Sequence, residues 1–484
     1  MSCAVPKGIT TDFFKQLDEA LRDKDSLSKE NKELKDKNKS LEEEKEKLKR
    51  ENEKLKKENE RLKMARQKDS SNSSKPSSTN GYKNVITNRR DKSNLKQGGQ
   101  PNHKYHCLDE GKIQELIDKG ATVEIIEVNK NKSNATCEYK TMKIIDIEFK
   151  TVIKEYRYYP DEAGNYEIPS NEIQNIVYGD TIKGFASCLM HHLPNSTDSV
   201  KEIISSITNE GIELSKGTLI NWTGTLAVEL QPEIENIEEK LLDSHYLNCD
   251  EINIKIDGED SNILCCSNST HTRFWVSESK TSEAIEAIGF LLLFMGVIVK
   301  DGTDIYNNFG TAFSQCLSHI LRYLKGLYDF INHKGPKEMA EFIKKCIDLR
   351  ENLIKKGKTQ FDKKTYSKLL EEYDKIIKSW KWEWMHDTEN VLYEEERKLL
   401  SRLEDSDKEQ VLYFLKDFRI PTTNNQAEAD QRPIKIKQKI GKFRSEEGAD
   451  NHTIIRSCIN TYKKNGINVL KALSTAFAGE PIIV

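Results

Sequence analysis

The chain has 484 residues, a formal net charge of −3 and charged side chains at 32% of its positions. This length is sufficient for two or three domains. The longest apolar run, "IGFLLLFMGVIV", is too short to cross a bilayer as a helix. Ten scattered cysteines form no regular disulfide framework. These features exclude a membrane-spanning protein and a disulfide-stabilised secreted domain, and they predict a reduced, cytoplasmic protein.

Leucine recurs at every seventh position between residues 27 and 63. If leucine occupies heptad position d, all five g–e' pairs of a parallel dimer are opposite in charge, whereas the a positions carry asparagine and lysine. We therefore predict an N-terminal segment (1–26), a leucine-zipper coiled coil (27–66) and a homodimer formed through the leucines. The alternative is a single solvated helix held by its own salt bridges.

Two segments of different composition follow the predicted coiled coil. Residues 67–103 are first rich in serine and then basic, which predicts a flexible basic linker. Its basic part either lies along a phosphate backbone or is simply solvated. Residues 104–172 contain the alternating stretches "TVEIIEVN" and "KIIDIEFKTVIKEYRYYP", which predict a small β module.

Residues 178–235 change to helical periodicity. The stretch "STDSVKEIISSITNEGIELSKGTLINWTGTL" predicts a helix, a turn at Gly211 and a second helix capped by Ser215. This order is typical of a DNA-binding helix-turn-helix, although an ordinary helical hairpin has the same pattern. The second helix would present three polar side chains to DNA, namely Lys216, Thr218 and Asn221.

Two aspartates occupy positions where a site is expected in a sheet. In "YLNCDEINIKID", Asp250 shares one strand face with Ile252 and Ile254. A carboxylate on an apolar face is costly unless it is paired or binds a metal ion. Asp301 follows the short apolar strand "VIV", and ligands often bind at such strand ends.

The order of predicted elements is three antiparallel strands, a helix, a strand and then helices, as in an α/β ribonuclease H-like fold. In that fold the first and fourth strands are neighbours, which would bring Asp250 and Asp301 together. Eight stretches extend the likeness from about residue 89 to residue 472: "GGQPNHKYHCL", "YGDTIKGFASCL", "GTLINW", "CDEINI", "GVIVKDGTDIY", "QCLSHILRYLK", "NNQAEADQRPIKIKQKIGKFRSEEGA" and "NTYKKNGINVLKAL". In this order, they resemble the insertion sequence 66 family of DDE-type transposases.

This resemblance implies a catalytic triad of Asp250, Asp301 and Glu428. The three acids would hold two Mg²⁺ or Mn²⁺ ions, cleave transposon ends and join the freed strand to target DNA. The implied partners are terminal inverted repeats, target DNA and small accessory proteins of the element, at the nucleoid of a bacterial cell. The alternatives are a catalytically decayed, dimeric DNA-binding protein and a coiled-coil scaffold whose acids are merely solvated. Thr303 and Thr423 depart from the family pattern.

The stretch "TTNNQAEADQRP" predicts the start of the helix that carries Glu428. Asn424 or Asn425 would cap this helix, and Arg432 would lie one turn beyond Glu428 on the same face. Basic residues follow with no acid among them, and they predict a strip that binds DNA: Lys435, Lys437, Lys439, Lys442 and Arg444. The alternative is a helix salt bridge beside a solvated basic face.

Two further groups of residues allow metal binding without requiring it. Cys316 and His319 lie one turn apart on a predicted helix, where packing beside the acids, contact with DNA and metal binding are all possible. The family's Cys-x-x-Cys zinc module is missing from the 104–172 segment. Its position is occupied by a set with the wrong spacing for zinc, namely His103, His106, Cys107 and Cys137.

The remaining domains are placed around the acids. Residues 245–335 and 419–445 would form the catalytic core, with the basic strip in the second part. Residues 336–418 would form an inserted helical domain. In that domain Trp380, Trp382 and Trp384 could pack in the core or stack on a splayed DNA base. A C-terminal helical region, 446–484, completes the chain.

Overall fold

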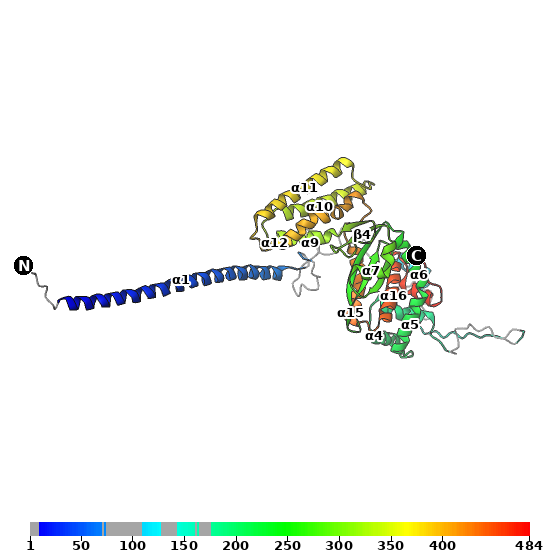
Figure 1. Ribbon diagram of the computed structural model, residues 1–484. Helices are drawn as coiled ribbons and strands as arrows, with labels where there is room; N and C mark the ends of the chain where they lie inside the picture. Colours follow the sequence, from blue (N-terminus) through cyan, green and yellow to red (C-terminus); the bar gives the residue numbers. More distant parts are fainter. Residues whose placement is uncertain (1–8, 70–71, 74–108, 127–142, 160–161, 164–175) are drawn as a thin grey trace, which may run out of the picture. The chain divides into compact units, whose positions relative to one another are not determined.

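A computed structural model describes residues 9–69, 72–73, 109–126, 143–159, 162–163 and 176–484 (Figure 1). The chain divides into two compact units. The first comprises residues 1–85, 230–469 and 481–484, and the second comprises residues 86–229 and 470–480. His103, His106, Cys107 and Cys137, the candidate zinc ligands, lie outside the described residues.

A five-stranded mixed sheet forms the centre of the first unit. Its strands are β1 (Tyr246–Ile256), β2 (Glu259–Ser267), β3 (Thr272–Ser277), β4 (Val297–Lys300) and β5 (Ala312–Gln315), in the order β3-β2-β1-β4-β5. The first three strands are antiparallel, whereas β4 runs parallel to β1 and β5 parallel to β4. The prediction that the first and fourth strands are neighbours is therefore confirmed.

Three helices, one before the sheet in sequence and two after it, pack on the sheet (Figure 1). They are α6 (Gln231–Leu242), α15 (Asn425–Ile440) and α16 (Glu446–Lys464). Helix α15 packs on β1 and β2, and α16 packs on β3 and α6. The apolar face of β1 meets Ala427 and Ile434 of α15, since Ile252, Ile254 and Ile256 are buried in the same cluster as these two residues. This packing brings the first turn of α15 to the polar end of β1.

Two helices connect β3 to β4, and a third follows β5. They are α7 (Ser282–Ile288), α8 (Phe290–Leu293) and α9 (Leu317–Tyr328). Thr281 caps α7 by accepting a hydrogen bond from the backbone N–H of Ala284 at 3.3 Å, and Gly289 ends it with a φ of 81°. Helix α9 begins directly after β5, at Cys316 as its N-cap residue. The chain thus places Cys316 and His319 next to the end of β4.

Residues 335–416 form a mostly helical segment that shares an apolar core with α9. The elements are α10 (Gly335–Lys355), α11 (Lys363–His386), α12 (Tyr393–Ser401), the π-helix η3 (Arg402–Ser406), α13 (Lys408–Val411) and α14 (Tyr413–Lys416). Trp380 is fully buried, and Trp384 stacks on Tyr393 with ring centroids 4.9 Å apart. Trp382 is exposed and stacks on His386. Two of the three tryptophans therefore pack within the domain, which leaves Trp382 as the one available to a base.

The N-terminal heptads form a single 59-residue helix, α1 (Ile9–Gln67). Its leucines at position d are more than half exposed in the single chain: Leu27, Leu34, Leu41, Leu48, Leu55 and Leu62. A helix of this length with an unburied leucine row gains little from its own packing. The row is the surface that the predicted dimer would bury.

The predicted β module is not formed in the residues that the structure describes there. Helix α2 (Glu110–Asp118) is followed by residues 119–126 and 143–159 without any assigned strand. Apolar side chains in both stretches are exposed, including Ile125 and Ile153. Alternating apolar residues form a stable strand only if the apolar face packs against another element. In the described residues these side chains are exposed and do not pack in this way.

The second unit is built from short helices. They are α3 (Asp180–Ser187), the π-helix η2 (Cys188–His192), α4 (Thr197–Ile207), α5 (Lys216–Glu229) and residues 470–477 of α17 (Val469–Phe477). Leu219 and Trp222 of α5 lie in its core with Val200 and Ile204 of α4. Among the described helices of both units, none has the length and apolar character that a bilayer crossing requires.

Candidate metal and DNA site

The register of β1 against β4 places the two aspartates side by side. Asn248 pairs with Val299 at the end of the parallel ladder. Two further residues along each chain lead to Asp250 and Asp301. Asp250 lies on the strand face that packs on α15, in line with buried Ile252 and Ile254. The pairing of β1 with β4 thus places Asp250 and Asp301 next to each other, although they are about fifty residues apart in sequence.

Glu428 reaches the same place from the first turn of α15. His319 lies between the acids, because its Nδ1 is 3.1 Å from Asp301 Oδ1 and its Nε2 is 3.9 Å from Glu428 Oε1. The side chains of Asp301 and Glu428 retain 29% and 28% of their exposure, so that solvent can reach both carboxylates. The structure therefore brings Asp250, Asp301 and Glu428 together around one partly open position.

Electrostatics show how closely the acids are packed. Burial, followed by the negative charge of Asp301, raises the pKa of Asp250 to about 6, and Glu428 adds to this effect. Burial and the charge of Asp250 likewise raise the pKa of Glu251 to about 7. Carboxylates this close destabilise one another when ionised. A cation bound among them would relieve that repulsion, and an oxygen-rich donor set suits Mg²⁺ or Mn²⁺.

His319 is the positive counterpart of these acids. Burial disfavours its charged form, but the nearby Asp301 and Cys316 side chains outweigh burial and raise the pKa of His319 to about 10. Cys316 and His319 thus lie beside the acids, and contact with DNA or binding of a metal ion stays a prediction.

Asn424 holds the start of α15 against β1, in a way that differs from the predicted cap. It occupies the N-cap position, yet its side chain makes no capping hydrogen bond. Its Nδ2 instead donates to the backbone carbonyl of Cys249 at 2.7 Å, and its Oδ1 accepts from Asn248 Nδ2 at 3.0 Å. A buried amide group needs hydrogen-bond partners. The carbonyl of Cys249, the residue before Asp250, is the partner of the Asn424 amide here. Asn425 is exposed at the first position of α15 and is not the cap either.

Part of the predicted basic strip shares the helical face of Glu428. Arg432, Lys435 and Lys439 follow it at steps of four, three and four residues, and all three are exposed. Lys435 is close enough to Asp250 to lower that group's pKa, against the larger effects of burial and Asp301. Among the described residues, Arg432 makes no ion pair with Glu428, so the alternative of a helix salt bridge between them is not observed. The exposed cations form a row that begins at the acids.

The other basic residues of the strip do not share this face. Lys437 is half-buried and donates to the backbone carbonyl of Gly441 at 3.5 Å, and its Nζ lies 6.0 Å from the centre of the Phe443 ring. Lys437 is therefore less accessible to DNA than the exposed lysines of α15, and its contact with DNA stays a prediction. Lys442 and Arg444 are exposed on either side of Phe443, beyond the end of α15.

Three residues near Asp301 were not singled out from sequence. Lys300 is fully buried at the end of β4 and donates to the carbonyl of Thr303 at 2.8 Å. Arg402, from the helical insertion, lies directly over Gly302, where an added Cβ would be 2.3 Å from Nη2. Gly302 thus permits the guanidinium to approach the backbone beside Asp301. A glycine after a strand-end aspartate is the only sequence signal that could have indicated this contact.

The predicted helix-turn-helix residues occupy the second unit. Ser215 caps α5 by accepting from the backbone N–H of Thr218 at 3.0 Å, as predicted. Lys216 and Asn221 are exposed and Thr218 is half-buried, although Lys216 pairs with Asp198 at 2.8 Å. The connection between α4 and α5 spans residues 208–215, longer than the three or four residues of a DNA-binding turn.

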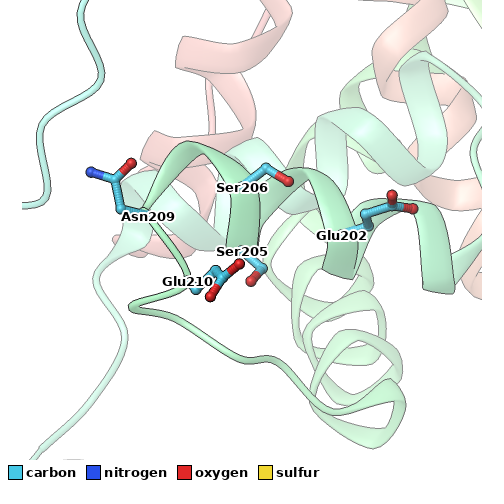
Figure 2. A pocket seen from close by; sticks show the side chains of 5 residues that line it. All are labelled: Glu202, Ser205, Ser206, Asn209 and Glu210. Atoms are coloured by element: carbon cyan, nitrogen blue, oxygen red, sulfur yellow. The ribbon is translucent and has the colours of Figure 1, made fainter.

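A surface pocket lies at the end of α4 in the same unit. Figure 2 shows its lining, which consists of Glu202, Ser205, Ser206, Asn209 and Glu210. Two carboxylates and no basic side chain make it unsuited to a DNA phosphate. None of the predicted site residues lines this pocket, so the site on the sheet remains the candidate for chemistry.

Comparison with known families gives one match. The sequence model described as the Transposase IS66 family matches residues 199–451. This stretch is slightly more than half of the 484 residues, and it includes Asp250, Asp301 and Glu428. A search of curated proteins found no match.

Proposed function

Since the chain belongs to the IS66 family of transposases, we propose that it cleaves DNA at transposon ends and joins the freed strand to target DNA. The observation that carries this proposal is the convergence of Asp250, Asp301 and Glu428 around His319. The strand order β3-β2-β1-β4-β5, with β4 and β5 parallel to β1, supports a ribonuclease H-like core. In such a core the acids would lie where adjacent strands and a later helix meet.

The three acids would hold two Mg²⁺ or Mn²⁺ ions. Such ions supply an activated water or 3′-hydroxyl and stabilise the leaving oxygen of a displacement at phosphorus. The remaining groups are the chain's own. Asn424 ties the start of α15 to the backbone at Cys249, and this fixes Glu428 relative to Asp250. His319 lies between Asp301 and Glu428 and would attract both carboxylates when its imidazole is protonated.

The test of this proposal uses the full chain and a duplex that carries the ends of the element. Cleavage should require Mg²⁺ or Mn²⁺ and should be lost when any one of the three acids is replaced. If the variants of all three acids cleave the duplex as fast as the unchanged chain, the proposed metal site is contradicted. Specific binding without any cleavage by the unchanged chain would instead favour the decayed, DNA-binding alternative.

We propose that the exposed cations on α15 bind the DNA backbone beside the acids. Replacing Lys435 and Lys439 together with alanine should weaken binding by a similar factor on all sequences. The slope of log K against log salt should fall by about one for each lost phosphate contact. Binding isotherms at several salt concentrations measure this slope.

The matched control is Lys437→Ala on the same helix. Because Lys437 bonds to Gly441 and covers Phe443, this change should leave the salt slope unaltered. An equal loss of slope in the control and in the double variant would show that the row on α15 has no special role. Lys216, Thr218 and Asn221 of α5 are proposed as a second, independent DNA contact.

We propose that two chains pair through α1, so that both ends of an element are held in one complex. Changing Leu41 to Glu and Leu48 to Lys leaves the net charge unchanged but places two charges in the seam. The mass measured by light scattering should fall from two chains to one, since buried unpaired charges are costly.

The control for this change exchanges charges on the outer face of the same helix, Glu43→Lys with Lys47→Glu. These positions lie away from the seam, so the dimer should persist. A dimer that survives the seam variant would contradict pairing through the leucines. Accessory proteins of the element remain additional proposed partners.

A further inference from the structure

Asp301, Cys316 and His319 form a second group of donor atoms next to the three acids. One carboxylate oxygen, one sulfur and one imidazole nitrogen from these residues all lie within 4.8 Å of one another. The register of β4 against β5 pairs Lys300 with Gln315, and the next residue on each chain is Asp301 and Cys316. His319 follows in the first turn of α9. The sequence showed only the Cys-x-x-His pair, and the sheet supplies the third ligand.

The surroundings of this group are suited to a bound ion. Cys316 and His319 are 1% and 8% exposed. His319 Nδ1 and Asp301 Oδ1 approach to 3.1 Å, yet neither atom has an aligned hydrogen bond. Buried polar atoms without an aligned partner are uncommon in proteins. The backbone N–H of Asn424 donates to Cys316 Sγ at 3.2 Å, and the same contact would stabilise a thiolate.

We propose that Asp301, Cys316 and His319 bind Zn²⁺ at a site that competes with the catalytic metal ions. Oxygen, sulfur and nitrogen donors together are typical of zinc, whereas Mg²⁺ takes oxygen ligands. Tetrahedral Zn²⁺ at bond lengths of about 2.0–2.3 Å sets its ligand atoms about 3.3–3.8 Å apart. Closing the 4.8 Å cluster to that size requires side-chain movements of about 1 Å. Three protein ligands leave the fourth position to water.

Sharing Asp301 makes the two kinds of metal site mutually exclusive. A carboxylate drawn toward Zn²⁺, Cys316 and His319 is withdrawn from the set that contains Asp250 and Glu428. Zn²⁺ should therefore inhibit cleavage in competition with Mg²⁺ or Mn²⁺. This inhibition rests on the proposed function, whereas zinc binding itself does not.

Equilibrium dialysis with Zn²⁺ on the full chain tests the site directly. Cys316→Ser, His319→Gln and Asp301→Asn should each lose one bound Zn²⁺ or bind it at least about 100-fold more weakly. Asp250→Asn should retain it, since Asp250 belongs only to the hard-ion site. The matched cysteine control is Cys188→Ser, which replaces a thiol in the other unit. Co²⁺ in place of Zn²⁺ should give a thiolate absorption band that Cys316→Ser abolishes.

Two outcomes would overturn the zinc site. Zinc binding that is unchanged in Cys316→Ser and His319→Gln would show that other residues bind the ion. Equal loss in Asp250→Asn and Asp301→Asn would assign the ion to the acids alone. Zn²⁺ should also raise the unfolding temperature of the unchanged chain but not of the three ligand variants. Because each chain is compared with and without Zn²⁺, this shift can be measured even in a variant that is less stable. Zinc binding as expected, in a chain that cleaves no DNA, would contradict the proposed function and leave the zinc site in place.

Discussion

Replacing Asp301 with asparagine should reduce metal-dependent cleavage of an end-bearing duplex by at least about 1000-fold, which corresponds to about 4 kcal/mol of the barrier. An amide has nearly the same shape as the carboxylate but carries no charge to bind a divalent ion. Asp301 is also the acid that contacts His319 and that acts most strongly on Asp250. Its loss therefore disturbs the whole group. Initial rates of nicking on a labelled duplex measure the effect.

Asp304→Asn is the matched control for this change. Asp304 lies three residues further on, is exposed, and accepts a hydrogen bond from Asn307 at 3.1 Å. Its replacement removes the same charge from the same loop and should change the rate by less than about threefold. Asp301→Cys adds a second test, because a thiolate is a softer ligand. It should recover part of the activity in Mn²⁺ but none in Mg²⁺. Equal rates for Asp301→Asn and Asp304→Asn would remove the basis for a catalytic metal site.

Local patterns predicted those features that depend on neighbouring residues alone. Alternation placed Asp250 on the apolar face of β1, and the packing of Ile252 and Ile254 against α15 agrees with it. A serine before a helical run predicted the cap at Ser215. Heptad spacing predicted the helix over residues 27–66, although α1 begins earlier, at Ile9. In each case the signal and its structural consequence lie within a few residues of one another.

Features that depend on distant partners could not be predicted in the same way. The direction of the Asn424 side chain is decided by Asn248 and the carbonyl of Cys249, far away in sequence. Lys437 turns inward because Phe443 pairs with the end of β1 and leaves an apolar surface to cover. The pairing of β4 with β5, two strands separated by a loop of eleven residues, sets Asp301 beside Cys316.

The largest effect on stability is expected at Glu396, in the helical insertion. Its side chain is fully buried, and both carboxylate oxygens accept hydrogen bonds. Trp380 Nε1 and His333 Nδ1 donate to Oε1 at 2.6 and 2.7 Å, and Asn390 Nδ2 donates to Oε2 at 2.6 Å. Glu396→Ala would leave these three donors without this acceptor, and the Trp380 donor is fully buried. Removing one partner of such a buried pair costs about 3–5 kcal/mol.

Tryptophan fluorescence during urea unfolding can measure this loss, because three of the five tryptophans lie in α11. The midpoint for the insertion should fall well below that of the unchanged chain. Glu394→Ala is the control on the same helix. Glu394 is exposed and pairs only with Arg397 at the surface, at 3.0 Å. Such pairs contribute less than about 1 kcal/mol.

The same buried pair gives the insertion a pH dependence of known sign. Burial lowers the pKa of His333, but the hydrogen bond and charge of Glu396, with Asp387, outweigh burial and raise it above its ordinary value. Folding therefore favours the protonated imidazole. The resulting stabilisation is complete below about pH 6.5 and is lost as the pH rises through the folded-state pKa. The urea midpoint for unfolding of the insertion should consequently decrease as the pH is raised from 6 to 9. In Glu396→Gln this decrease should be smaller. A midpoint that changes with pH equally in the two chains would show that His333 and Glu396 do not stabilise the insertion as an ion pair.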